Sequence, residues 1–200
     1  MKTSNIGDAF QHGIDLLKGD DSVDKTFCSQ KNYPGHQTAR PAFARAREKV
    51  FDVNRWSDVS SLTAGFILHD AAGQPKPTGP PTVGDLIRLE LPGPTPVNWV
   101  KVIQVVDAET KAGFTARPCA DPHKNENRTE HFFTDESTST FRVEWVGNTL
   151  TACQIGKNER INNQNPEAGG RAVVNTVIAT TGWLLYQKIQ WKTLMDYLLE

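Results

Sequence analysis

Cysteine is scarce in this chain of 200 residues, which has only Cys28, Cys119 and Cys153. An odd number of cysteines at such wide spacing is not the disulfide framework of a small secreted domain. We therefore expect a reducing compartment, the cytoplasm, and thiols that are buried and chemically inert.

The chain also lacks an excess of either charge, since 22 basic and 23 acidic residues leave a formal net charge of -1. A balanced chain has no overall field to attract a phosphate backbone, so we expect no nucleic-acid partner.

The longest apolar run, 172–186, is interrupted by Asn175 and is shorter than the roughly 20 residues of a membrane helix. The first residues hold no apolar stretch typical of a signal peptide. We expect no membrane span.

Motifs for phosphates and nucleophiles are missing as well. The glycines at Gly84-Asp85 and Pro92-Gly93-Pro94 are followed by no lysine and no helix, so they predict turns rather than phosphate loops. No G-x-S-x-G elbow occurs. The sequence therefore predicts neither nucleotide binding nor a cofactor.

The first 37 residues predict an N-terminal arm outside the main domain. Apolar residues at helical spacing predict a short helix at 6–18, and the polar, turn-rich segment 19–37 predicts an exposed connector. Residues 25–29 are a poor strand candidate. The single domain is expected to span residues 38–200.

Within that domain the hydrophobic period changes from helix to strand and back. A helix is expected from Thr38, with Pro41 in its first turn, to about Asn54. About six strands follow, in the segments 62–68, 83–91, 97–106, 113–117 and the hairpin 138–155 that turns at Gly147-Asn148. The segment 97–106 is apolar on both faces, which predicts a central strand covered on each side. The proline-rich stretch 74–82 predicts a loop.

The last predicted element is one long helix at about 171–199, whose apolar positions, including the stem of Lys188, recur close to every 3.6 residues. At about 1.5 Å per residue it would be near 40 Å long. Strands joined as hairpins and flanked by helices predict the α+β class, with a curved antiparallel sheet of about six strands packed against the C-terminal helix.

This order resembles the helix-grip fold of the Bet v 1, START and polyketide-cyclase-like superfamily, and the chain looks like a bacterial member. The resemblance lies in the helix that ends in 46–56, the strand 83–91, and the terminal helix with Trp183 and Trp191. It implies a cavity for an apolar small molecule or lipid between sheet and helix, and transfers no catalytic residue. One departure is that such proteins usually begin with a strand, whereas the segment before the first helix is polar here.

Aromatic side chains at strand and helix spacing either line such a cavity or fill an ordinary core. The candidates for a ligand cavity are Phe66, Trp99, Phe114, Phe141, Trp145 and Trp183. The candidates for its polar rim are Arg117, Asn158 and Arg160.

Catalytic candidates lie in the polar segments 129–139 and 157–163. An acid–base pair or a hydrogen-bonding rim is available there from His131, Asp135, Glu136, Asn158, Glu159 and Arg160. The alternative is that these residues form a turn and a solvated loop.

A nucleophilic triad would need Cys119 or Ser139 with His131 and Glu136. A metal site would need the four ligands Cys119, His123, His131 and Cys153. No cysteine has a close cysteine neighbour, so we expect no bound metal.

Three hypotheses for the function follow. The first is a binding module for an apolar small molecule or lipid. The second is a protein-interaction subunit that docks through residues 1–37. The third is a cyclase- or hydrolase-like enzyme that uses His131 or Glu136.

Overall fold

The computed structural model describes residues 23–60, 64–90, 97–124, 133–159 and 183–200, with side chains from residue 186 onward in the last range. Seven strands form one sheet in the order β1-β7-β6-β5-β4-β3-β2, and every neighbouring pair is antiparallel. The strands are β1 (Val23–Asn32), β2 (Gly65–His69), β3 (Leu86–Glu90), β4 (Asn98–Ala108), β5 (Lys111–Pro118), β6 (Thr138–Val146) and β7 (Thr149–Glu159). The predicted α+β class and curved antiparallel sheet are confirmed, with seven strands instead of about six.

The strand that sequence analysis did not count is β1, at one edge of the sheet. The connector predicted at 19–37 is therefore wrong over residues 23–32. Its polar composition has a physical reason, because its core-facing side chains bind the terminal helix through hydrogen bonds: Ser29 donates to Asp196 at 2.6 Å and Lys31 to the carbonyl of Leu199 at 3.2 Å. The predicted arm and its helix at 6–18 lie mostly outside the described residues and stay a prediction.

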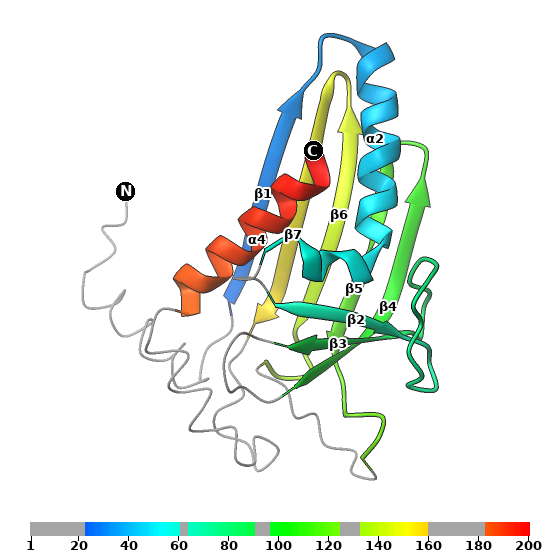
Figure 1. Ribbon diagram of the computed structural model, residues 1–200. Coiled ribbons are helices and arrows are strands. Elements are labelled where there is room, and N and C mark those ends of the chain that lie inside the picture. Colours follow the sequence, from blue (N-terminus) through cyan, green and yellow to red (C-terminus); the bar gives the residue numbers. More distant parts are fainter. Residues whose placement is uncertain (1–22, 61–63, 91–96, 125–132, 160–182) are drawn as a thin grey trace, which may run out of the picture.

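The sheet is strongly curved, and Figure 1 shows β2 and β3 running crosswise to the long strands β1, β7 and β6. A bulge interrupts the pairing of β4 with β5 between Val102 and Gln104. The prediction that this segment is covered on both faces is wrong, because Val102 is fully buried whereas Ile103 is 38% exposed. An antiparallel sheet needs only one covered face, and the bulge adds Ile103 on the wet side.

Helix α2 (His36–Phe51) follows β1, beginning two residues before the predicted Thr38. Its buried face carries the small residues Ala39, Ala42 and Ala46, which let it approach β5, β6 and β7 closely. The short 3-10 helix η1 (Val53–Asp58) comes next and buries Trp56 at the centre of the core.

Two side chains of η1 hold it against the edge strand β2. Ser57 Oγ accepts a hydrogen bond from the amide of Phe66 at 2.8 Å and donates to its carbonyl at 3.0 Å. Asn54 accepts from the amide of Leu68 at 2.8 Å. These contacts occupy backbone groups that an open sheet edge would leave unpaired, and they fix Trp56 next to β2.

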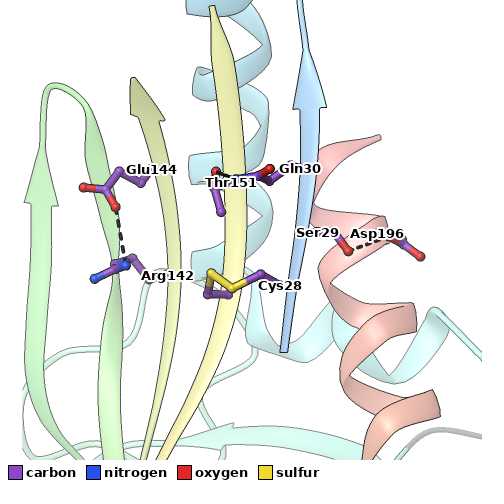
Figure 2. The surroundings of a disulfide bond; sticks show 8 residues. Cys28, Ser29, Gln30, Arg142, Glu144, Thr151 and Asp196 are labelled. Carbon is purple, nitrogen blue, oxygen red and sulfur yellow. Dashed lines mark hydrogen bonds and ion pairs between the residues drawn. A yellow bond between two sulfur atoms is a disulfide. The ribbon is translucent and has the colours of Figure 1, made fainter. Parts of the chain in front are cut away.

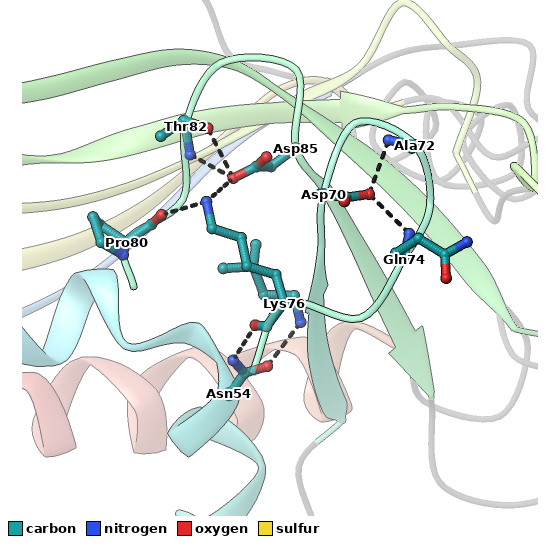
Figure 3. Close-up of polar contacts among 9 residues, drawn as sticks. Asn54, Asp70, Ala72, Gln74, Lys76, Pro80, Thr82 and Asp85 are labelled. Carbon is teal, nitrogen blue, oxygen red and sulfur yellow. Dashed lines mark hydrogen bonds and ion pairs between the residues drawn. The ribbon is translucent and has the colours of Figure 1, made fainter. Parts of the chain in front are cut away.

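The loop that contains the proline-rich stretch is held by its own polar contacts (Figure 3). Lys76 donates to the carboxylate of Asp85 at 2.6 Å, and its carbonyl accepts from the side chain of Asn54 at 2.9 Å. Asp85 also accepts from the amide of Thr82 at 2.8 Å. The predicted loop at 74–82 is present, and Asn54 joins it to η1.

The terminal helix α4 (Trp183–Leu199) has 17 residues and is therefore about 26 Å long. Figure 1 shows it crossing in front of β1 and β7, and it also contacts α2. The rest of the predicted helix, 171–182, lies outside the described residues. Lys188 is exposed, so its predicted place on the apolar face is wrong. No helix in the described ranges has the length and apolar character needed to cross a membrane.

A disulfide joins Cys28 of β1 to Cys153 of β7, across 125 residues of sequence (Figure 2). The two cysteines are direct cross-strand partners, and they lie on the sheet face away from the core. The predicted inert thiols are wrong for this pair, and the pairing removes the ground on which a reducing compartment was expected. Cys119 is the free cysteine, and burial raises the pKa of its thiol to about 11.

Candidate functional site

A pocket of about 70 Å³ lies between the concave face of the sheet and α4. Its floor comes from β3, β4, β5 and β6, and its sides from η1, β2, β7 and α4. The apolar wall includes Trp56, Phe66, Ile87, Leu89, Phe141 and Trp191. The polar groups on the wall include Asn98, Ser139, Glu159, Gln187 and Gln190.

The aromatic wall is built around Trp56. Its ring centroid lies 5.4 Å from that of Phe66 and 4.9 Å from that of Phe141. Trp191 of α4 approaches Phe141 at 5.5 Å from the other side. The indole N–H of Trp56 donates to the carbonyl of Lys49 at 2.9 Å, so the ring is fixed by a hydrogen bond as well as by packing.

Of the aromatic residues predicted to line a cavity, the structure brings Phe66 and Phe141 to the pocket. Phe114 lies beyond them in the core, stacked on Trp56 at 5.7 Å. Trp99 lies on the opposite face of the sheet against His69, and Trp145 contacts α2 at the far end. Trp183 is the first residue of α4, and its side chain lies outside the described part of the structure.

The predicted polar rim is not at the pocket. Arg117 and Asn158 are exposed, and Arg160 lies outside the described residues. The polar end of the pocket is instead formed by Glu159 and Gln187, which are both almost completely buried.

Glu159 reaches the pocket because β7 contains a bulge. Between two paired positions β1 advances from Val23 to Lys25, whereas β7 advances from Gly156 to Glu159, so β7 has one extra residue. Asn158 adopts a φ of 52°, a left-handed conformation that asparagine tolerates better than most residues. Even-numbered residues of β7 face the core up to this point, and the extra residue turns the odd-numbered Glu159 to the same side.

The bulge is held from outside by Asp24 of β1. Its carboxylate accepts a hydrogen bond from the amide of Asn158 at 3.0 Å and one from Lys157 at 2.5 Å. The hydrogen bond from Lys157, followed by the one from Asn158, holds the pKa of Asp24 below its usual value. The left-handed residue therefore has its backbone N–H satisfied.

Inside the pocket the carboxylate of Glu159 meets two donors from distant elements. Lys25 Nζ lies 3.2 Å from Glu159 Oε2 and donates to Gln187 Oε1 at 2.9 Å. Gln187 Nε2 lies 3.4 Å from the same Oε2. The side chain of Glu159 is 2% exposed and that of Lys25 is 17% exposed. Burial raises the pKa of Glu159, and the neighbouring Lys25 opposes this shift.

Other candidates from the sequence do not converge among the described residues. Glu136 is exposed, and His131 lies outside the described residues, so no catalytic pair of the two is seen. Ser139 lines the pocket, where its hydroxyl accepts a hydrogen bond from Gln154 at 3.2 Å. Cys153 is in the disulfide and cannot join a metal set. The described ranges contain no group of three or more His, Cys, Asp or Glu placed to bind a metal.

Sequence reasoning named Glu159 among its catalytic candidates but missed Trp56, Lys25 and Gln187. The apolar residues next to Trp56 ended a predicted helix and gave no hint that the ring is central. Lys25 and Gln187 are polar residues without a motif, and only the pairing of β1 with β7 and the docking of α4 bring them together.

No protein-family model matches the sequence, and no curated protein matches it significantly. Among solved structures, a hypothetical protein from Helicobacter pylori is similar over 92% of each chain, with a TM-score of 0.51 and 10% sequence identity. At a sequence identity this low, the likeness shows only that the two proteins share a fold. The strand β1 before the first helix removes the one departure noted in the sequence, and the sheet curves around the terminal helix. The chain has a helix-grip fold.

Two further solved structures match with lower TM-scores. Norcoclaurine synthase from Thalictrum flavum matches with a TM-score of 0.44 and 14% identity, over 92% of this chain and 91% of that one. A major latex-like protein from Panax ginseng matches with a TM-score of 0.40 and 12% identity, over 84% of this chain and 96% of that one. Neither likeness carries an argument about function.

Proposed function

We propose that this protein binds a small apolar molecule in the pocket between the sheet and α4. The observation that carries the proposal is an aromatic wall that leaves about 70 Å³ of space beside a buried polar end. Ligand sites are mostly apolar, with a few convergent polar groups that orient the ligand. The pocket has this composition.

The size of the space limits the ligand. A closed apolar cavity of about 150 Å³ holds one benzene ring, so a space of about 70 Å³ admits at most one small ring, and the wall side chains must move apart to take it. Typical pockets for drug-sized ligands are larger, at about 300–1,000 Å³. The volume therefore favours a molecule with one ring or a short chain over a sterol or a whole lipid, which narrows the hypothesis drawn from the sequence.

The proposal is tested with toluene, an apolar ring of this size, in an NMR titration that follows the indole N–H signals of Trp56 and Trp191. Saturable shifts are expected in the wild-type protein. Ala116→Leu adds three heavy atoms to a buried wall position, so toluene should bind at least tenfold more weakly. The matched control is Ala108→Leu, the same change at an exposed position, which should bind as wild type does.

Overpacking in a core costs about 1–3 kcal/mol, so the thermal midpoint of Ala116→Leu is measured alongside binding. Leu89→Phe, at a half-buried position of the same wall, is a second way to fill the pocket. No saturable binding by the wild-type protein, or unchanged binding by both folded pocket variants, would defeat the proposal.

A further inference from the structure

At the polar end of the pocket, one acceptor atom, Glu159 Oε1, receives no hydrogen bond from the described residues. Both donors near Glu159, Lys25 and Gln187, approach the same oxygen, Oε2. None of the residues in the described ranges donates to Oε1. This oxygen lies only 2.0 Å from the place where a Cβ at position 156 would stand, so the carboxylate takes its position because that residue is glycine.

Three other acceptors of the wall already receive hydrogen bonds, and among the buried donors of the wall the indole N–H of Trp191 has no partner in the described part of the structure. Gln190 Oε1 accepts from the amide of Ala64 at 3.1 Å, and Gln187 Oε1 accepts from Lys25. Ser139 Oγ accepts from the side chain of Gln154. Glu159 Oε1, unlike these three acceptors, is able to accept a hydrogen bond from a bound molecule without losing one from the described residues.

The charge of this end decides what kind of donor fits. Lys25 and Glu159 together carry no net charge, and the surrounding wall is apolar. A cationic ligand would face Lys25 and leave an extra positive charge in the pocket, and an anionic ligand would face Glu159 and leave an extra negative one. Uncompensated charge is costly in such surroundings, whereas a neutral O–H group adds a hydrogen bond and no charge.

Resting on the proposed function, we infer that the pocket selects a neutral single-ring molecule with one hydroxyl group, of the phenol class, whose O–H donates to Glu159. The ring occupies the space between Trp191 and the cluster of Trp56, Phe66 and Phe141. The hydroxyl lies at the end formed by Glu159 and Gln187, which Lys25 contacts.

Four probes of similar size separate the possibilities: phenol, toluene, benzylamine as a cation and benzoate as an anion. Each is titrated into the wild-type protein at pH 7 by the same NMR measurement. Phenol should bind at least tenfold more tightly than toluene, which corresponds to about 1.4 kcal/mol. Benzylamine and benzoate should both bind more weakly than phenol.

Two variants test the role of the carboxylate in different ways. Glu159→Leu removes the acceptor and leaves Lys25, which is already partly exposed, free to turn toward water. Gly156→Ala keeps the charge but places a methyl group where Oε1 lies. In both, the preference for phenol over toluene should fall to about threefold or less. Gly35→Ala is the matched control, because a Cβ there meets nothing within 4 Å.

The outcomes distinguish the two proposals. If toluene and phenol bind the wild-type protein equally, the inference about the hydroxyl is wrong while the apolar pocket stands. If neither binds, the proposed function itself fails. Tightest binding of benzylamine or benzoate overturns the inference, and so does a phenol preference that both folded variants retain.

Discussion

Glu159 has an environment that disfavours its charge and a partner that favours it. Its side chain is 2% exposed, and burial raises its pKa. Lys25 lies 3.2 Å from its carboxylate and acts in the opposite direction. Removing one member of such a buried pair leaves the other uncompensated, so the pair restricts which substitutions are tolerated.

The raised pKa predicts how stability depends on pH. Because the folded protein binds the proton of Glu159 more tightly than the unfolded chain, this residue makes the fold less stable as pH rises above about 4.5. The glutamine side chain in Glu159→Gln does not titrate. The free energy of unfolding of this variant should therefore increase relative to that of wild type as pH rises from 4.5 to 7. Urea unfolding at a series of pH values measures the difference. A constant difference, or one of opposite sign, would show that the pKa is not raised.

At this scale the sequence was a partial guide. Glu159 was a candidate because it lies in a polar segment, but that segment was also consistent with a solvated loop. The decisive feature is burial, and burial depends on which elements pack together. Strand spacing selected Phe66 and Phe141, which line the pocket, but it also selected Trp99, which lies on the other face of the sheet.

Among the elements, β7 has the irregularity that matters most to the site. The extra residue at its end turns Glu159 inward, and Asn158 takes the left-handed conformation that this requires. Bulges of this kind often change the direction of a side chain next to a functional site. The hydrogen bond from the amide of Asn158 to Asp24 fixes the bulge to β1.

A β-branched residue is strained in the left-handed region, which costs about 1–3 kcal/mol. Asn158→Val should therefore lower the free energy of unfolding by about that amount, whereas Asn158→Gly should stay within about 0.5–1 kcal/mol of wild type. Chemical denaturation with both variants measures this. Equal stability of the valine variant and wild type would argue against the left-handed conformation.

The order and the type of most elements followed from hydrophobic periodicity. The hairpin at Gly147-Asn148 was found because Gly147, with a φ of 59°, is the kind of residue that a tight turn needs. The strand β1 was missed because three of its inward side chains, those of Lys25, Ser29 and Lys31, are polar and form hydrogen bonds with α4, which interrupts the apolar alternation. The N-cap of α2 was placed three residues late, since Gly35 rather than Thr38 precedes the helix.

On the scale of the whole molecule, the disulfide closes a loop that contains most of the sheet. It links β1 to β7, and these two strands also form the wall that carries Lys25 and Glu159. Cross-linking residues that are 125 positions apart removes much of the conformational freedom of the unfolded chain. The ion pair of Lys25 with Glu159 therefore joins two strands that are also linked covalently.

The double variant Cys28→Ala/Cys153→Ala should lose about 3–5 kcal/mol of unfolding free energy. Wild type measured in dithiothreitol should approach the value of the double variant. Cys119→Ala is the matched control, and it should respond to the reductant as wild type does because it keeps the disulfide. Denaturant unfolding with and without reductant measures all these free energies of unfolding. A wild-type unfolding curve that is unchanged by reductant would refute the prediction.

The sequence by itself determined the α+β class, the hairpin-built sheet and the terminal helix, because each depends on local periodicity and turn residues. Only the tertiary structure decided the cysteine pairing, the edge strand β1 and the inward turn of Glu159. Each of these depends on which distant segments meet: β1 pairs with β7 more than 100 residues later, and α4 supplies Gln187. Local patterns describe how a segment folds, but the partner that a polar side chain finds is fixed only when the segments pack.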